Sequence, residues 1–97
     1  MTITKEQKGN SLIIALEGRL DTTTAPELEK ELKSLDGVAE LKLDFAKLEY
    51  ISSAGLRVLL AAHKTMSKQG GMKVTNVNEI VREVFDVTGF ADILTIE

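Results

Sequence analysis

The sequence predicts an α/β fold, built on a mixed, largely parallel sheet of about five strands with helices mainly on one face. Segments that alternate every second residue, as strands do, are followed by segments with the apolar spacing of helices. The expected inner strands carry charges at alternate positions, whereas strands covered by helices on both faces are continuously apolar. Because the 97 residues include no linker or repeat, we expect residues 1–97 to form a single domain around one core.

The chain begins with an expected hairpin. Residues 2–8 alternate without a strongly apolar side, which predicts a polar strand at an edge of the sheet. Gly9-Asn10 is typical of a tight hairpin turn. Residues 11–17 predict the second strand, with its leucine and isoleucine side chains on one face. The segment from Gly18 to Asp21 is expected to lead into a loop.

A first helix is expected to begin near Thr24. The run Thr24-Ala25-Pro26-Glu27 matches a capping box, with proline in the first turn where its missing N–H is not needed. Asp36-Gly37 is expected to end this helix. Its predicted apolar stripe comprises Ala25, Leu28, Leu32 and Leu35.

The second half of the chain predicts three more strands and two more helices. In order, these are a strand over 39–45, a helix from about Ser53 to Gln69, a strand over 72–75, a helix capped within Asn76–Asn78 and ended by Gly89, and a short strand over 93–96. The long helix has an apolar stripe of Leu56, Leu59, Leu60 and His63. In the following helix, Ile80, Val81, Val84 and Phe85 are expected to face inward.

The composition excludes several kinds of site. The chain has no cysteine and a single histidine, so we expect neither a thiolate site nor a metal site. Its net charge of −3 argues against a general nucleic-acid binder. No segment has the pattern of a signal peptide or the apolar length of a membrane span. We therefore expect a cytoplasmic protein that binds neither nucleic acid nor membrane.

The run Ile51-Ser52-Ser53-Ala54-Gly55-Leu56 is the sharpest candidate for a function. It joins a strand to the start of the long helix, where Ser52 or Ser53 can cap the helix and need do nothing more. The same place would also accept a phosphate, because the first N–H groups and the helix dipole favour an anion. The residues alone leave both interpretations open.

The turn from Asp21 to Thr24 is a second polar feature. It can be a solvated loop with a capping residue, or a surface beside the serines, since loops after parallel strands gather at one sheet edge. The sequence offers no catalytic pair, because Ser53 and His63 would lie about 15 Å apart along one helix. No glycine-rich phosphate loop is present. The residues themselves therefore give no positive evidence of an enzyme.

Three blocks of the chain form a recognisable pattern: Gly18-Arg19-Leu20-Asp21-Thr22-Thr23-Thr24-Ala25, then Leu43-Asp44-Phe45 through Ser52-Ser53-Ala54-Gly55-Leu56, and last Asn76 through Thr88-Gly89-Phe90. These blocks resemble the STAS domain proteins that act as anti-sigma factor antagonists. Their order and spacing span almost the whole chain. The resemblance implies a fold with helices on one side of the sheet, in agreement with the alternation described above.

The resemblance also implies partner switching. In that family the unphosphorylated antagonist binds an anti-sigma factor that is a serine kinase, phosphorylation ends the complex, and a PP2C-type phosphatase resets it. Alignment on Gly55-Leu56 places the acceptor at Ser53. The chain departs from the family at Ser52, where aspartate is usual, and at Ala54, where serine is usual. Ser52 is therefore the alternative acceptor.

These inferences define an expected interface and two alternatives. The alternatives are a STAS scaffold or sensor module that phosphorylation does not control and, ranked last, an enzyme or nucleotide binder. The residues expected to bind the partner are Asp21, Thr22, Thr23, Thr24, Ser52, Ser53, Ala54, Gly55, Arg57 and Lys64.

Overall fold

The computed structural model describes residues 1–97 and contains one five-stranded sheet with three α-helices. The strands lie in the order β1-β2-β3-β4-β5, with β1 antiparallel to β2 and every other pair parallel. The elements are β1 (Thr2–Lys8), β2 (Ser11–Leu20), α1 (Ala25–Glu31), β3 (Glu40–Ile51), α2 (Ser53–Ser67), β4 (Gly71–Thr75), α3 (Glu79–Thr88), η1 (Phe90–Asp92) and β5 (Thr95–Ile96). The predicted mixed, largely parallel sheet is confirmed, with β1 as its polar edge strand.

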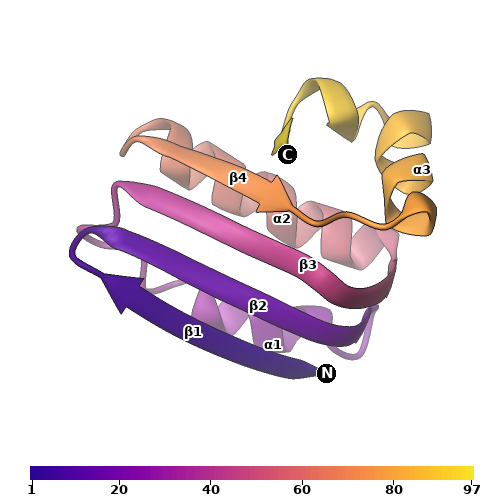
Figure 1. Ribbon diagram of the computed structural model, residues 1–97, viewed down its shortest axis with the longest axis horizontal. Helices are drawn as coiled ribbons and strands as arrows, with labels where there is room; N and C mark the ends of the chain where they lie inside the picture. The colour runs from indigo at the N-terminus through magenta and orange to yellow at the C-terminus, as the bar shows by residue number, and fades with distance from the viewer.

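The helices cover one face of the sheet. Figure 1 shows α1 and α2 behind the strands, while α3 lies at the end of the molecule where β3 and β4 finish. In β3, Leu41, Leu43 and Phe45 alternate with more exposed residues and are buried on the helix side. Phe85 of α3 packs on Phe45 with the ring centroids 6.5 Å apart. The alternating burial of β3 and the position of α1 and α2 behind the strands confirm the one-sided arrangement expected from the alternation.

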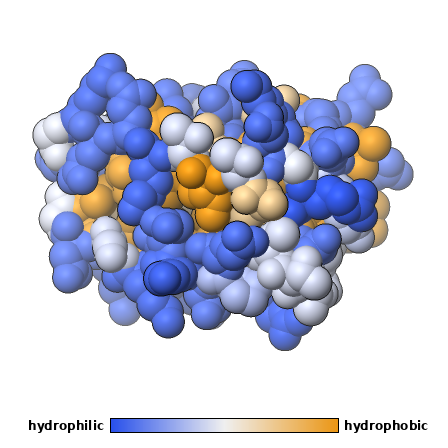
Figure 2. Space-filling model, turned by 90° about the horizontal axis from the view of Figure 1, so that it is seen from below, coloured by the Kyte–Doolittle hydropathy of each residue, from blue (hydrophilic) through white to orange (hydrophobic).

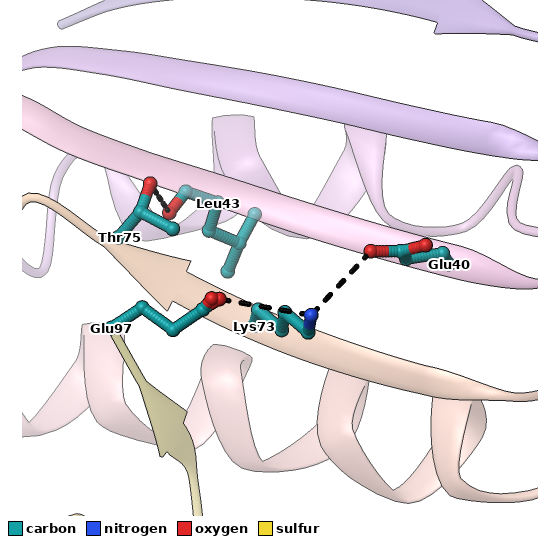
Figure 3. Close-up of polar contacts among 5 residues, drawn as sticks. All are labelled: Glu40, Leu43, Lys73, Thr75 and Glu97. Atoms are coloured by element: carbon teal, nitrogen blue, oxygen red, sulfur yellow. Dashed lines mark hydrogen bonds and ion pairs between the residues drawn. The ribbon is translucent and has the colours of Figure 1, made fainter.

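The helix-free face is held together by polar side chains. Figure 3 shows Lys73 of β4 between the carboxylates of Glu40 and Glu97, at Nζ to oxygen distances of 3.9 and 3.7 Å. Beside it, the hydroxyl of Thr75 lies 3.5 Å from the carbonyl oxygen of Leu43. These contacts join β3, β4 and the C-terminal residue on the side that no helix covers.

The second strand is longer than the sequence suggested. β2 continues through Gly18 and Arg19 to Leu20, in a stretch that we expected to be a loop. Gly18 has φ = 108°, and the register of β2 with β3 shifts on both sides of it. The glycine thus absorbs an irregularity in the ladder, and the strand resumes so that Leu20 is buried in the core.

The first helix is shorter than expected and lacks the predicted capping box. α1 ends at Glu31, and the side chain of Thr24 makes no cap hydrogen bond. The segment beyond the helix is instead held by Gln69, whose amide donates to the carbonyl oxygens of Leu35 and Val38, both at 2.8 Å. Leu35 is therefore buried from a loop and not from a helical stripe.

The third helix begins and ends as predicted, but the prediction that Ile80 faces inward is wrong. The Asn78 Oδ1 atom accepts from Val81 N at 2.8 Å, and Gly89, with φ = 83°, ends the helix. Val81 and Phe85 are buried, whereas Ile80 is 60% exposed. The predicted last strand is reduced to Thr95–Ile96, because a short 3₁₀ turn precedes it.

The surface has no large continuous hydrophobic area on the side that carries the edge strand β1. Figure 2 shows this side as mainly hydrophilic, with hydrophobic groups in small separate areas. Of the three helices, none has the length and apolar character that a membrane span requires.

Candidate functional site

Two adjacent serines lie at the junction of β3 and α2 and have different structural roles. Ser52 is the N-cap, with an extended backbone at φ = −100° and ψ = 175°, and its hydroxyl accepts from Gly55 N at 3.5 Å. Ser53 is the first residue of the helix and is exposed. The capping role predicted for one of the two hydroxyls therefore belongs to Ser52. The Ser53 hydroxyl is left accessible from solvent.

Gly55 fixes the position of this helix start. It is buried, and a Cβ atom placed on it would lie 2.7 Å from Leu20 Cγ and 2.9 Å from Ile51 Cγ1. Only a residue without a side chain lets the helix approach the ends of β2 and β3 this closely. Gly55 therefore positions its exposed neighbours and is not placed to contact a partner itself.

The turn after β2, residues 21–24, is organised by Asp21 and is called the Asp21 turn below. The Asp21 carboxylate accepts from Thr23 Oγ1 at 2.7 Å and from Thr23 N at 3.0 Å, and Thr24 N lies 3.2 Å away. The Thr24 hydroxyl donates to the carbonyl oxygen of Arg19 and accepts from Asp21 N, both at 2.8 Å. These bonds hold the chain in a tight, ordered turn.

The same bonds lower the pKa of the Asp21 carboxyl group. The Thr23 hydroxyl contributes most, burial is the second-largest cause and raises the pKa, and the N–H groups of Thr23 and Thr24 lower the pKa further. Hydrogen bonds donated to a carboxylate favour its charged form. Asp21 is therefore a fixed negative charge at this turn.

The structure brings the Asp21 turn and the start of α2 together. Ser52 N donates to the carbonyl oxygen of Leu20 at 2.9 Å, directly before the turn. A shallow hollow of about 260 Å³ is lined on one side by Thr22 and on the other by Ala54 and Arg57. Two segments about thirty residues apart in sequence thus form one surface, as expected from the positions of loops in a parallel sheet.

Lys64 lies away from this hollow. It is exposed on α2, eleven residues after Ser53, which is about 16 Å along a helix axis. Of the residues predicted from the sequence, it is the one that the structure separates from the others. A partner that contacts both Ser53 and Lys64 must cover about three turns of α2.

Beside the site, Arg19 and Tyr50 form a contact that was not predicted from the sequence. The Arg19 guanidinium carbon lies 4.5 Å from the centre of the Tyr50 ring, and the two residues are opposite one another in the β2–β3 ladder. This distance is typical of a cation–π contact. Because Arg19 was expected in a loop, its place across from Tyr50 could not be anticipated.

The largest hollow lies away from the two serines. The largest, about 510 Å³, is lined by residues that include His63, Gly71 and Lys73 at the beginning of β3 and β4, the sheet edge opposite Ser53. Lys73 is already paired with two carboxylates there. No group of three or more His, Cys, Asp or Glu residues is arranged to hold a metal ion.

Comparison with known proteins agrees with this arrangement. The STAS domain family model matches residues 2–97. The chain belongs to the STAS domain family. Its resemblance to that family, inferred from the three sequence blocks, is confirmed.

Several relatives of this STAS chain are named as anti-sigma factor antagonists. The chain is 36% identical over 99 residues to BtrV of Bordetella bronchiseptica, which is provisionally named an anti-sigma factor antagonist, covering 99% of this chain and 85% of BtrV. It is 33% identical over 93 residues to the anti-sigma-B factor antagonist of Bacillus subtilis, covering 94% of this chain and 85% of that protein.

Solved structures support the same fold. An anti-sigma factor antagonist from Mycobacterium paratuberculosis is 25% identical, with a TM-score of 0.89 over 98% of this chain and 83% of the other. The unphosphorylated form of the antagonist SpoIIAA matches with a TM-score of 0.85 at 19% identity, over 99% of this chain and 88% of SpoIIAA. At that identity the match to SpoIIAA shows a shared STAS fold.

Proposed function

We propose that this chain is an anti-sigma factor antagonist that binds an anti-sigma factor and is released when Ser53 is phosphorylated. The observation that carries the proposal is the division between the two serines: Ser52 caps α2, while Ser53 is exposed on the first turn. The relatives named as anti-sigma factor antagonists supply the class of partner.

The position of Ser53 suits a reversible modification. A phosphate there adds about −1.5 to −2 charges at the positive end of a fifteen-residue helix, where the folded state tolerates it. Ser53 is exposed, so a kinase can reach it without unfolding the chain. Modification therefore changes the charge of the surface and leaves the core unchanged.

The same charge disturbs an interface that covers Ser53. The hollow between the Asp21 turn and α2 is shallow and open to a partner, and Ala54 at its edge is a small side chain. A phosphate placed in such an interface changes its charge, and each 1.4 kcal/mol of net cost to binding lowers the affinity about tenfold. A cost of a few kcal/mol is enough to release the partner without a change of fold.

The proposal implies two further enzymes and a location. The anti-sigma factor is a serine kinase that supplies ATP chemistry, and a PP2C-type phosphatase removes the phosphate. The antagonist itself needs no cofactor, acts in the cytoplasm, and contacts neither nucleic acid nor membrane. Its contribution is the serine and the surface around it.

The test begins with the cognate anti-sigma factor, identified from a gene adjacent to that of this chain or by pull-down. The purified chain is incubated with that kinase and ATP, and the phosphate is located by tandem mass spectrometry. We expect one phosphate on Ser53, retained in Ser52→Ala and lost in Ser53→Ala. Binding of the two forms to the kinase, measured by calorimetry, should be strong before modification and weak after it.

Two results would count against the proposal. Phosphate on Ser52, or on a residue outside this junction, would refute the assignment of Ser53. Binding of equal strength before and after modification would identify a scaffold or sensor module that phosphorylation does not control.

A further inference from the structure

The outer side of α2 carries positive charges only. Arg57 and Lys64 are exposed on the helix, and Lys68 is exposed at its C-cap. Between Ser53 and Lys68 there is no aspartate or glutamate, although the chain as a whole has 15 acidic residues and 12 lysines and arginines. The basic character of this helix is therefore opposite to that of the molecule.

These three residues form one row together with Ser53. With about 100° per residue, positions 53, 57, 64 and 68 fall within an arc of about 60° on the helix. The row is about 22 Å long, since each helical residue rises about 1.5 Å. We call Arg57, Lys64 and Lys68 the basic stripe. Ser53 lies at its N-terminal end.

The charges of the basic stripe are not neutralised within the molecule. None of its three residues forms an ion pair, whereas Lys5, Lys73 and Arg82 elsewhere are paired with carboxylates. Glu29 lines the same hollow as Arg57 without forming an ion pair with it. The stripe is thus an unpartnered row of cations on an exposed helix face.

We infer that the basic stripe docks on an acidic surface of the protein partner, and that a phosphate on Ser53 loosens this contact by neutralising Arg57. The inference rests on the proposed function for the existence of that partner. It specifies the partner's chemistry and the way in which the switch acts.

The neighbouring helix favours a protein over a uniform polyanion. α1 packs beside α2, and its exposed Glu29 lines the same hollow as Arg57, so an acidic group lies next to the N-terminal end of the basic stripe. Nucleic acid or an anionic membrane would be attracted by the stripe and repelled by Glu29, and the net charge of −3 adds to the repulsion. A folded protein can present an acidic surface to the stripe and a neutral or basic group to Glu29.

The spacing of Ser53 and Arg57 explains how the phosphate acts. The two residues are four positions apart on one helix face, where side chains are about 5–6 Å apart at Cβ. A phosphate of about −1.5 to −2 charges outweighs the single charge of Arg57. The end of the stripe nearest the Asp21 turn then becomes negative and repels an acidic partner.

The first test measures binding of the cognate anti-sigma factor to charge-reversed variants by surface plasmon resonance. At about 0.05 M NaCl we expect Arg57→Glu and Lys64→Glu each to weaken binding about tenfold or more, and at about 0.5 M the effect should shrink. Lys47→Glu changes the net charge equally but lies on the helix-free face, beside Asp44 and Glu17, and should alter binding less than about twofold. Thermal unfolding of each variant checks that the fold is intact.

The second test is a double-mutant cycle between Ser53→Asp and Arg57→Ala. If the negative charge acts by neutralising Arg57, Ser53→Asp weakens binding less in the Arg57→Ala background than in the wild type. If it acts through its own desolvation, the loss is as large or larger without Arg57. The second result would overturn the inferred way in which the switch acts.

The remaining outcomes separate this inference from the proposed function. Binding that stays strong at high salt and in both Arg57→Glu and Lys64→Glu would refute an acidic docking surface on the partner. The antagonist role would remain intact. Binding of a DNA duplex or of anionic phosphatidylserine vesicles at about 0.15 M salt, lost in Arg57→Glu, would assign the stripe to a polyanion and overturn the inference. If the wild type binds no anti-sigma factor at all, the proposed function fails, and the inference with it.

Discussion

At the scale of single residues, the two serines at the start of α2 have separate functions because their backbones differ. Ser52 has an extended backbone that turns its hydroxyl toward Gly55 N, while Ser53 is helical and directed to solvent. A family aspartate at the Ser52 position would accept the same N–H, since both side chains are good caps. The substitution at Ser52 therefore keeps the cap and leaves Ser53 as the outward hydroxyl.

This separation predicts different effects on stability. Ser52→Ala removes the cap, and we expect it to lower the free energy of unfolding by about 0.5–1 kcal/mol, near the lower end for caps because the bond is 3.5 Å long. Ser53→Ala should change it by less than about 0.5 kcal/mol, as is usual for exposed positions. Urea unfolding followed by circular dichroism measures both. An equal loss in the two variants would show that Ser53 also has a structural role.

Gly55→Ala tests the close approach of the helix to the sheet. Alanine favours a helix over glycine by about 1 kcal/mol, but the new methyl group would meet Leu20 and Ile51 at less than 3 Å. Overpacking of this kind typically costs about 1–3 kcal/mol, so we expect a net loss of stability.

The control for this substitution is Gly71→Ala. A Cβ atom at Gly71 would have no neighbour within 4 Å, and its φ is not positive. This variant should be neutral or slightly stabilising in the same urea unfolding experiment. A Gly55→Ala protein as stable as the wild type would show that α2 can move away from the strands without penalty.

At the scale of elements, Asn78 joins α3 to the sheet with one side chain. Its Oδ1 atom accepts from Val81 N, and its Nδ2 atom donates to the carbonyl oxygen of Leu48, both at 2.8 Å. The first bond caps the helix and the second fixes the helix against β3. The ring contact between Phe45 and Phe85 lies about two helical turns further along α3.

We expect Asn78→Ala to destabilise the protein by about 1–3 kcal/mol, because it removes a cap and leaves the carbonyl of Leu48 without this donor. Asn78→Asp keeps an acceptor for Val81 N but cannot donate, so its loss should be intermediate. Denaturant unfolding of the two variants and the wild type gives the order. If aspartate and alanine are equally destabilising, the bond to Leu48 accounts for the whole effect.

The same elements show what local sequence can and cannot predict. Asn78 and Gly89 were found at the ends of α3 because caps act within a few residues. The end of α1 was missed because Leu35 continues a helical spacing, while the bonds that place it come from Gln69, more than thirty residues later. The segment from Gly18 to Asp21 was expected to lead into a loop, although pairing with the neighbouring strand holds Gly18 in the ladder.

The candidate site divides in the same way. Ser52, Ser53 and the Asp21 turn were found from local patterns of capping and turn residues. The closeness of the Asp21 turn to the start of α2, and the pairing of Arg19 with Tyr50, depend on the register of β2 with β3. The general rule that loops gather at one edge of a parallel sheet predicts the closeness of the two segments, but it does not predict that register.

At the scale of the whole molecule, the fold separates two kinds of surface. The helix side contains the core and the proposed interface, and the opposite face carries polar and charged side chains such as Lys73 and Glu40. Asp44 lies on that opposite face and accepts from Asn76 Nδ2 and Ala46 N, both at 3.0 Å. It thus joins the middle of β3 to the residue that follows β4.

These bonds predict how stability depends on pH. The Asn76 amide, followed by the Ala46 N–H, holds the pKa of the Asp44 carboxyl group below its usual 3.8, while burial acts in the opposite direction and Lys42 and Lys47 lower the pKa further. Asp21 is shifted in the same direction. A carboxyl group with a lower pKa in the folded state adds stability above its unfolded pKa, and this contribution is lost as the pH falls through the folded pKa.

We therefore expect the urea midpoint to be nearly constant from neutral pH to about pH 5, and to fall below about pH 4. Asp44→Asn should flatten this fall, because asparagine does not titrate, and Asp21→Asn combined with it should flatten the fall further. Asp36→Asn, at an exposed turn, is the matched control and should leave the acid part of the curve unchanged. Since neither Asp21 nor Asp44 belongs to the core, the acid part of this curve reports the polar contacts of these two residues and not the apolar packing. A profile as steep in the double variant as in the wild type would mean that other carboxylates, and not these two, govern acid unfolding.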